Sequence, residues 1–106
     1  MKIYVKLPDE TVREAAGNSG QTIMEVMRDA GVPVRADCGG AMACASCHVV
    51  VDDEWMPLVG AADGEESDLL DASNYRAPNS RLSCQIKAVD KLDRLSVTLQ
   101  LDALEA

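Results

Sequence analysis

Hydrophobic and polar residues alternate along several stretches of the chain, and each alternation predicts a β-strand. The two-residue period is clear in residues 3–7, 82–88 and 95–101, and it is the period of a strand that buries one face. Residues 10–16 predict a weaker strand that returns beside the first one. The three consecutive valines in residues 48–51 predict a short, fully buried strand.

A helix with a clear beginning is predicted between the strands of residues 10–16 and 48–51. Thr22 and Glu25 have the spacing of a capping box, in which Thr22 is the N-cap and Glu25 lies at the third helical position. Gly31 and Pro33 then end the helix. Its methionines are expected to fill the core rather than bind a ligand. Four residues form its predicted apolar stripe: Ile23, Val26, Met27 and Ala30.

A second helix, rich in acidic residues, is predicted from about Gly64 to Ala72. Acidic residues crowd its first turn, where the helix dipole favours negative charge. Leu69 and Leu70 are expected to anchor its inner face. Residues 55–58 predict a turn or an irregular helix before it. The resulting order of elements, ββαβ(α)ββ, is an α+β pattern.

Negative charge is concentrated in one segment of the chain. The formal net charge is −8, and residues 52–71 hold eight acidic residues and no Lys or Arg. The remaining ten acidic residues balance the ten Lys and Arg. Such a surface repels nucleic acid and attracts a basic protein partner, whose association it accelerates at low salt. A solvated acidic helix that only maintains solubility has the same pattern.

The remaining composition limits the class of protein. The 106 residues suffice for one domain, spanning residues 1–106, with a modest core. Because the chain has no Phe, that core must be mainly aliphatic. No apolar run is long enough to span a bilayer, so no membrane insertion is expected. The N-terminal segment lacks the apolar stretch of a secretory signal, so we expect a cytoplasmic protein, and we expect it to be a monomer.

All four cysteines of the chain fall into one pattern. Five residues separate the first from the second, two separate the second from the third, and thirty-six separate the third from the fourth. The four are Cys38, Cys44, Cys47 and Cys84. A [2Fe–2S] cluster requires four thiolates. An iron–sulfur electron carrier is therefore the leading hypothesis, with these cysteines as its candidate ligands.

Other uses of four cysteines agree less well with this spacing. A disulfide framework needs an oxidising compartment, and no export signal is visible. Structural zinc sites usually contain two pairs of ligands, and the members of each pair are separated by only two to four residues. Here only Cys44 and Cys47 form such a pair. Residues 44–48 match the haem-attachment pattern C-x-x-C-H, but a haem there would leave Cys38 and Cys84 without a role. A zinc-binding interaction module remains the alternative from a different functional class.

The loop that holds three of the cysteines has the composition that an anionic cluster needs. Between the cysteines of residues 37–47, every residue except Met42 is Gly, Ala or Ser. Gly39 and Gly40 let the backbone approach closely, so that backbone N–H groups can donate to the cluster sulfurs. His48 follows a candidate ligand directly. We expect its ring to hydrogen-bond the backbone and hold the loop against the sheet.

These motifs together resemble the vertebrate-type [2Fe–2S] ferredoxins, the family of adrenodoxin, putidaredoxin and their bacterial relatives. The similarity runs over nearly the whole chain and includes the cysteine spacing. It is carried by Asp37-Cys38-Gly39-Gly40, by residues 44–49, by residues 65–71 and by residues 80–86. The resemblance implies a β-grasp fold of the α+β class. We expect a mixed sheet of about four to five strands, one main helix and a short acidic helix.

The resemblance also implies an electron-transfer protein rather than an enzyme, and it indicates where partners bind. An FAD-containing, NAD(P)H-dependent ferredoxin reductase would load one electron onto the cluster, and a cytochrome P-450 monooxygenase would receive it. The acidic helix of about residues 63–72 would be the main docking element. Five acidic residues match the docking positions of the family: Asp37, Glu65, Glu66, Asp68 and Asp71.

Two other ferredoxin functions fit the same motifs. A ferredoxin of iron–sulfur cluster assembly shares the spacing and the acidic helix, and it would donate electrons to a cysteine desulfurase and its scaffold. A ferredoxin that feeds a ring-hydroxylating dioxygenase is the other alternative. The sequence also leaves two residues open. Trp55 either packs inside or faces a partner, and Arg81 is either a surface cation or the partner of an acid near the cluster.

Overall fold

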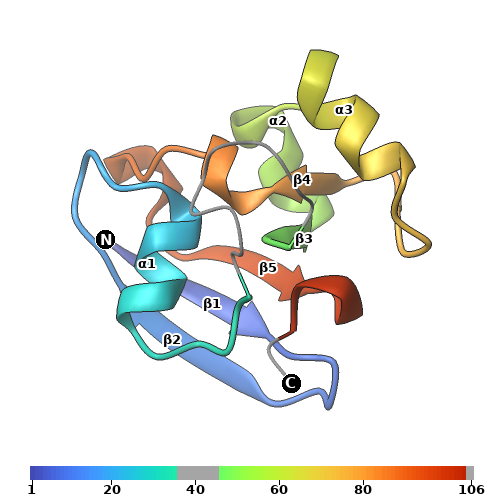
Figure 1. Ribbon diagram of the computed structural model, residues 1–106. Coiled ribbons are helices and arrows are strands. Elements are labelled where there is room, and N and C mark those ends of the chain that lie inside the picture. The colour runs from blue at the N-terminus through green and yellow to red at the C-terminus, as the bar shows by residue number, and fades with distance from the viewer. Residues whose placement is uncertain (36–45, 105–106) are drawn as a thin grey trace.

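The computed structural model describes residues 1–35 and 46–104, and its strands form one mixed sheet (Figure 1). The strands are β1 (Lys2–Lys6), β2 (Val12–Ala16), β3 (His48–Val51), β4 (Ser80–Leu82) and β5 (Leu95–Leu99). The helices are α1 (Ile23–Asp29), α2 (Met56–Val59) and α3 (Gly64–Asp71). Short 3₁₀ turns are η1 (Asp53–Trp55), η2 (Ser83–Gln85), η3 (Asp90–Leu92) and η4 (Leu101–Ala103).

The strand order β2-β1-β5-β3-β4 places the first and the last strand of the chain side by side. β1 runs parallel to β5 and antiparallel to β2, and β3 runs antiparallel to its two neighbours, β4 and β5. The predicted mixed sheet is therefore confirmed. With α1 packed on it, the arrangement is a β-grasp fold of the α+β class.

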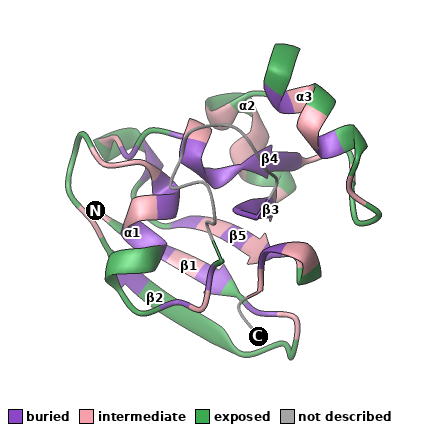
Figure 2. Cartoon of the chain, in the orientation of Figure 1, coloured by how far each residue is buried: buried purple, intermediate pink, exposed green. Residues whose placement is uncertain are grey.

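The hydrophobic residues that alternate in β1 and in β5 lie on one face of the sheet, and that face is buried (Figure 2). Ile3 and Val5 of β1 pair with Leu95 and Val97 of β5, and all four side chains are fully buried. The residues between them are exposed or half-buried. The core is therefore aliphatic, as a chain without Phe requires.

Helix α1 begins where the sequence predicts and ends slightly earlier. The Glu25 backbone N–H donates to the Thr22 hydroxyl (3.2 Å), and the Thr22 N–H donates to the Glu25 carboxylate (2.9 Å), which completes the capping box. Gly31, at a φ of 81°, follows the helix. The buried residues of α1 are Ile23, Met24, Val26 and Met27. Ala30 is exposed, contrary to the predicted stripe, because the helix has already ended at Asp29.

The acidic segment folds into α2 and α3, and α3 packs beside β4 at the end of the sheet (Figure 1). α2 is a single turn, as expected for residues 55–58, and Trp55 is half-buried against the core. In α3, Leu70 is fully buried and Leu69 packs against the core in part. Within the described ranges no helix combines the length and the apolar character that crossing a membrane requires.

The strand predicted for residues 82–88 is wrong beyond its first residue. β4 ends at Leu82, and the chain then turns through η2. Cys84 and Ile86 are both buried, so the alternation of apolar residues continues through the turn although no strand does. This turn directs Cys84 toward the segment that precedes β3, as described below.

The last predicted strand is also shorter than its alternation. β5 ends at Leu99, and Leu101 is 54% exposed at the start of η4. The Gln100 N–H donates to the His48 carbonyl oxygen (3.1 Å), and the chain leaves the sheet after this bond. Leu101 therefore lies outside the core that its pattern predicted for it.

Candidate metal centre

The two cysteines that the structure describes come from segments far apart in the sequence. Cys47 immediately precedes β3, and Cys84 lies in η2. Both side chains are buried, and both are free thiols. The predicted site residues of the preceding loop lie outside the described residues: Asp37, Cys38, Gly39, Gly40 and Cys44.

Hydrogen bonds from Ser83 hold the η2 turn against the segment of Cys47. The Ser83 N–H and the Ser83 hydroxyl both donate to the Cys47 carbonyl oxygen, at 3.1 and 2.7 Å. On the other side of the turn, Gln85 Nε2 donates to Cys84 Sγ (3.4 Å). The turn that replaces the predicted strand therefore places Cys84 beside Cys47.

The two thiols change each other's proton affinity. A hydrogen bond with the Cys84 side chain raises the pKa of Cys47, and burial raises it further. The same hydrogen bond lowers the pKa of Cys84 to about 6. The two sulfur atoms are therefore close enough to share a proton in a hydrogen bond. A positive metal centre replaces such a proton and makes both groups thiolates.

This donor set fits a [2Fe–2S] cluster. Two neighbouring, buried sulfur atoms are soft ligands of the kind that iron–sulfur centres use. The side chain of Gln85 supplies an N–H donor to one of them. Within residues 1–35 and 46–104 no third Cys, His, Asp or Glu joins the pair. Cys38 and Cys44, which precede the described segment, are the remaining candidates for the other two ligand positions.

His48, the residue after Cys47, is fully buried and links three segments. Its Nδ1 lies 3.1 Å from Asp102 Oδ1, and its Nε2 lies 2.6 Å from Ser80 Oγ. Because a carboxylate only accepts, Nδ1 carries the proton and donates to Asp102, while the Ser80 hydroxyl donates to Nε2. Burial lowers the pKa of His48, which favours this neutral form. The predicted bond to the backbone is wrong, because both ring partners are side chains.

Ser80, His48 and Asp102 stand in the hydrogen-bond order of a hydrolase triad, yet the arrangement is structural. Ser80 is only 2% exposed, so a substrate cannot reach its hydroxyl. That hydroxyl also accepts a hydrogen bond from the Ala77 N–H (2.8 Å). The Ser73 hydroxyl donates to the same Asp102 carboxylate. The network therefore joins β3, β4, η4 and the turn that follows α3.

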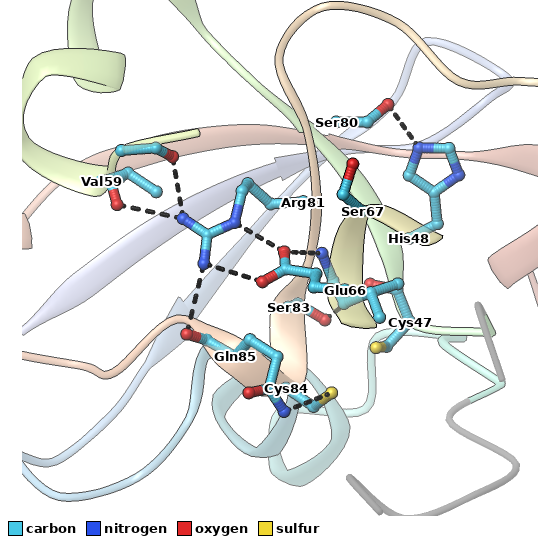
Figure 3. A network of polar contacts seen from close by, with 12 residues as sticks. Cys47, His48, Val59, Glu66, Ser67, Ser80, Arg81, Ser83, Cys84 and Gln85 are labelled. Carbon is cyan, nitrogen blue, oxygen red and sulfur yellow. Dashed lines mark hydrogen bonds and ion pairs between the residues drawn. The ribbon is translucent and has the colours of Figure 1, made fainter. Parts of the chain in front are cut away.

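A second buried network surrounds the η2 turn (Figure 3). Arg81 and Glu66, 8% and 6% exposed, form an ion pair with Nε at 2.6 Å and Nη2 at 3.2 Å from the carboxylate. Nη1 donates to the carbonyls of Val59 and Gly60 (3.0 and 2.8 Å), and Nη2 donates to that of Gln85 (3.4 Å). All five guanidinium N–H groups therefore have acceptors. Arg81 is the partner of an acid beside the candidate metal centre.

The predicted docking role of Glu66 is wrong, because its carboxylate is bonded within the protein. Its carboxylate accepts from Arg81 and, in addition, from the Leu82 N–H (2.9 Å). A buried carboxylate with these partners cannot meet a basic residue of another protein. Glu66 instead fixes α3 to β4 and η2, and so to the segment of Cys84.

The other acidic residues of α3 lie at the surface but differ in their partners. Asp71 forms an ion pair with Arg76, whose guanidinium also donates to the Ser67 carbonyl and hydroxyl. Glu65 and Asp68 are exposed. In the described part of the chain neither of these two carboxylates has an ion-pair partner. Their charges are therefore not compensated by an ion pair within the described part of the chain.

Sequence reasoning missed the partners of His48. Ser73, Ser80 and Asp102 lie 25, 32 and 54 residues away from it along the chain, so no local pattern connects them to it. The one available signal was the histidine itself. A buried imidazole next to a candidate ligand needs two hydrogen-bond partners, but this requirement does not identify them.

Comparison with known families and proteins supports the same centre. Residues 7–89, which include all four cysteines, match the family model described as a 2Fe-2S iron-sulfur cluster binding domain. The chain is 43% identical over 79 residues to the 2Fe-2S ferredoxin CtmE of Castellaniella defragrans, a match that covers 74% of this chain and 74% of that one.

Two solved structures are similar over nearly their whole length. The ferredoxin from Rhodopseudomonas palustris HaA2 has a TM-score of 0.92 and 37% identity, covering 97% of this chain and 99% of that one. The covalent complex of putidaredoxin reductase and putidaredoxin contains a chain with a TM-score of 0.87 and 35% identity, covering 93% of this chain and 97% of that one.

Proposed function

Since the chain belongs to the family of [2Fe–2S] ferredoxins of the adrenodoxin and putidaredoxin type, and carries electrons on a [2Fe–2S] cluster, we propose that it moves single electrons from an FAD-containing ferredoxin reductase to a cytochrome P-450 monooxygenase. One NAD(P)H gives two electrons to the reductase, which reduces two ferredoxin molecules in turn. The cluster supplies the one-electron chemistry, and the protein sets its position and its recognition by partners.

We assign the four cysteine thiolates as the ligands of the cluster: Cys38, Cys44, Cys47 and Cys84. The side-by-side burial of Cys47 and Cys84 supports this assignment for two of them. Gly39 and Gly40 would supply close backbone donors to the cluster sulfurs. His48 holds the segment of Cys47 through its two side-chain hydrogen bonds.

The observation that carries the proposal is the attachment of α3 to both cysteine segments. Near its first turn, Glu66 bonds Arg81 and Leu82, which lead into the turn of Cys84. Just beyond its last turn, Ser73 bonds Asp102, which in turn accepts from His48 beside Cys47. A protein docked on α3 therefore lies next to the cluster, where an electron can pass.

Electrostatics support a basic partner at this helix. Glu65 and Asp68 offer free carboxylates there, and Asp71 and Asp37 are the further docking acids that the family resemblance implies. A similar chain is held covalently to a reductase in a solved structure, which supports a reductase as one partner. If both partners use this one face, the protein must release the first before it binds the second.

Reconstitution with proteins of the source organism tests the proposal. The anaerobically purified chain is mixed with NAD(P)H, an FAD-containing reductase and a P-450 oxygenase, and reduction of the oxygenase is followed as its carbon monoxide complex. We expect rapid reduction that requires all three proteins. The control omits the ferredoxin.

Two failures would have different meanings. A ferredoxin that its reductase bleaches, but that no P-450 oxidises, would contradict the oxygenase assignment and leave the electron carrier intact. The same reduced protein would then be offered to a dioxygenase and to a cysteine desulfurase. A chain that no reductase reduces would contradict the proposal as a whole.

A further inference from the structure

Four large hydrophobic side chains are exposed in the described part of the chain: Val12, Leu58, Tyr75 and Leu101. Two of them lie on segments that contact each other beside the cluster ligand Cys47. We propose that Tyr75 and Leu101 form the apolar anchor of the docking face for the reductase. This inference rests on the proposed function, and it adds a contact that the acidic residues do not provide.

Hydrogen bonds bring the two segments together. Leu101 directly precedes Asp102, and the Ser73 hydroxyl donates to the Asp102 carboxylate. The Tyr75 backbone N–H donates to the same Ser73 hydroxyl (3.1 Å). Figure 1 shows the turn after α3 and the η4 turn on the same side of the molecule. Tyr75 and Leu101 therefore flank one hydrogen-bonded junction, and they are 44% and 54% exposed.

The junction is fixed to the strand that follows Cys47. Asp102 accepts from His48 Nδ1 (3.1 Å), and the Gln100 N–H donates to the His48 carbonyl (3.1 Å). The backbone around the exposed side chains is thus anchored to buried groups. Side chains on a fixed backbone lose less conformational entropy on binding. A partner seated at this junction lies against the hydrogen-bond network of His48, the residue that follows Cys47 in the sequence.

The surroundings of the junction indicate the chemistry of the partner. Arg76, the neighbour of Tyr75, lies against Asp71 and Ser67, so its charge is neutralised within the protein. Farther along α3, Glu65 and Asp68 are free. An apolar centre beside a charged rim is the usual anatomy of a protein interface, and Tyr is among the residues that dominate binding energy. The matching partner is basic at its rim and apolar at its centre.

The other two exposed hydrophobic residues lack these surroundings. Val12 lies on β2, the edge strand at the far side of the sheet from β4. Leu58 lines a cavity of about 250 Å³ together with Lys87 and Lys91. These lysines would repel a basic partner. Val12 and Leu58 therefore serve as controls, because they are at least 44% exposed, as Tyr75 and Leu101 are, and are differently placed.

The test compares two double variants of the cluster-loaded protein. One carries Tyr75→Ser and Leu101→Ser, and the control carries Val12→Ser and Leu58→Ser. Binding of each to the source organism's reductase is measured by titration calorimetry at low and at high salt. We expect the first variant to bind about tenfold more weakly, in the range of interface anchors, and the control to bind within about twofold of the unchanged protein. Visible spectra and thermal unfolding verify that both variants are folded and loaded.

Salt dependence separates the anchor from the acidic residues. The loss caused by the Ser substitutions should be similar at both salt concentrations, because apolar contact is not screened, whereas charge attraction is. Equal affinity of the two double variants would overturn the inference while leaving the reductase assignment intact. If the unchanged protein itself binds no reductase, the proposed function fails first.

Discussion

At the scale of single residues, Arg81 and Glu66 form a buried ion pair in which each charge depends on the other. Both side chains are buried, and removal of one partner would leave the other as an uncompensated charge. We expect Glu66→Gln or Arg81→Met alone to lower the free energy of unfolding by about 3–5 kcal/mol. The double variant should recover part of this loss. Chemical denaturation of all three variants measures it, and fully additive losses would show that the two groups do not interact.

The same pair should affect the metal centre. Arg81 and Glu66 support the turn that carries Cys84, so the single variants are expected to lose visible absorption faster than the unchanged protein when warmed. Identical bleaching rates would show that the turn holds Cys84 without them.

His48 is the second residue whose role can be tested alone. His48→Ala removes a buried ring that bonds Ser80 and Asp102, and it leaves a cavity as well as a buried Ser80 hydroxyl without its acceptor. We expect a loss of stability of about 2–4 kcal/mol and a shorter lifetime of the bound cluster. Thermal unfolding and bleaching measure both effects. The surviving protein should still accept electrons from dithionite. A variant that keeps its cluster normally but transfers no electrons would contradict the structural role.

At the scale of elements, the capping box of α1 offers a prediction with a pH dependence. Thr22→Ala should cost about 1 kcal/mol of stability, as the loss of an N-cap does. The hydrogen bond from the Thr22 N–H lowers the pKa of Glu25 from its usual 4.5. A carboxyl whose pKa is lower in the folded state stabilises the fold above pH 4.5 and loses this effect as the pH falls through the lowered value.

Glu25→Gln is the matched variant for this pH dependence. Glutamine can still accept from the Thr22 N–H, but it does not titrate. Stability measured from pH 6 to about pH 3 should therefore decline less steeply in Glu25→Gln than in the unchanged protein. If the two stability profiles are parallel, ionisation of Glu25 does not contribute to the loss of stability at low pH.

Helix α3 yields the test of charge-guided docking. Asp68→Lys reverses a free charge on the proposed docking helix, and Glu14→Lys reverses a charge on β2, where the side chain is 62% exposed and lies 3.9 Å from Lys2. At low salt we expect Asp68→Lys to raise the KM of the reductase about tenfold and Glu14→Lys to raise it far less. High salt should remove most of the difference. Equal effects of the two variants would exclude a local docking role for α3.

Local patterns predicted the elements that rest on local causes. Residues 48–51 form β3, Thr22 and Glu25 begin α1, and the acidic run forms α3, because burial period, capping and helix dipole act within a few residues. The strand prediction for residues 82–88 was wrong for a non-local reason. The hydrogen bonds from Ser83 to Cys47 bend the chain there, and an apolar alternation alone does not distinguish a strand from a turn that buries its apolar residues.

At the scale of the whole molecule, the residue types of the site could be predicted, but the hydrogen bonds and ion pairs between distant segments could not. The spacing of the cysteines predicted the metal chemistry. It could not show that Glu66 would be turned inward to Arg81, fifteen residues away, or that Asp102 would reach His48. Such pairs depend on how the sheet brings distant segments together. Their effect is to make the acidic helix and the cysteine segments parts of one hydrogen-bonded body.

On the proposed function, this chain holds a pair of iron atoms through four thiolates and passes one electron at a time. The most direct measurement is metal and sulfide analysis of the anaerobically purified protein, followed by titration with dithionite. We expect about two iron and two inorganic sulfide per chain, and bleaching that is complete after about one electron. A colourless protein that contains zinc or no metal, and that takes up no electron, would contradict it.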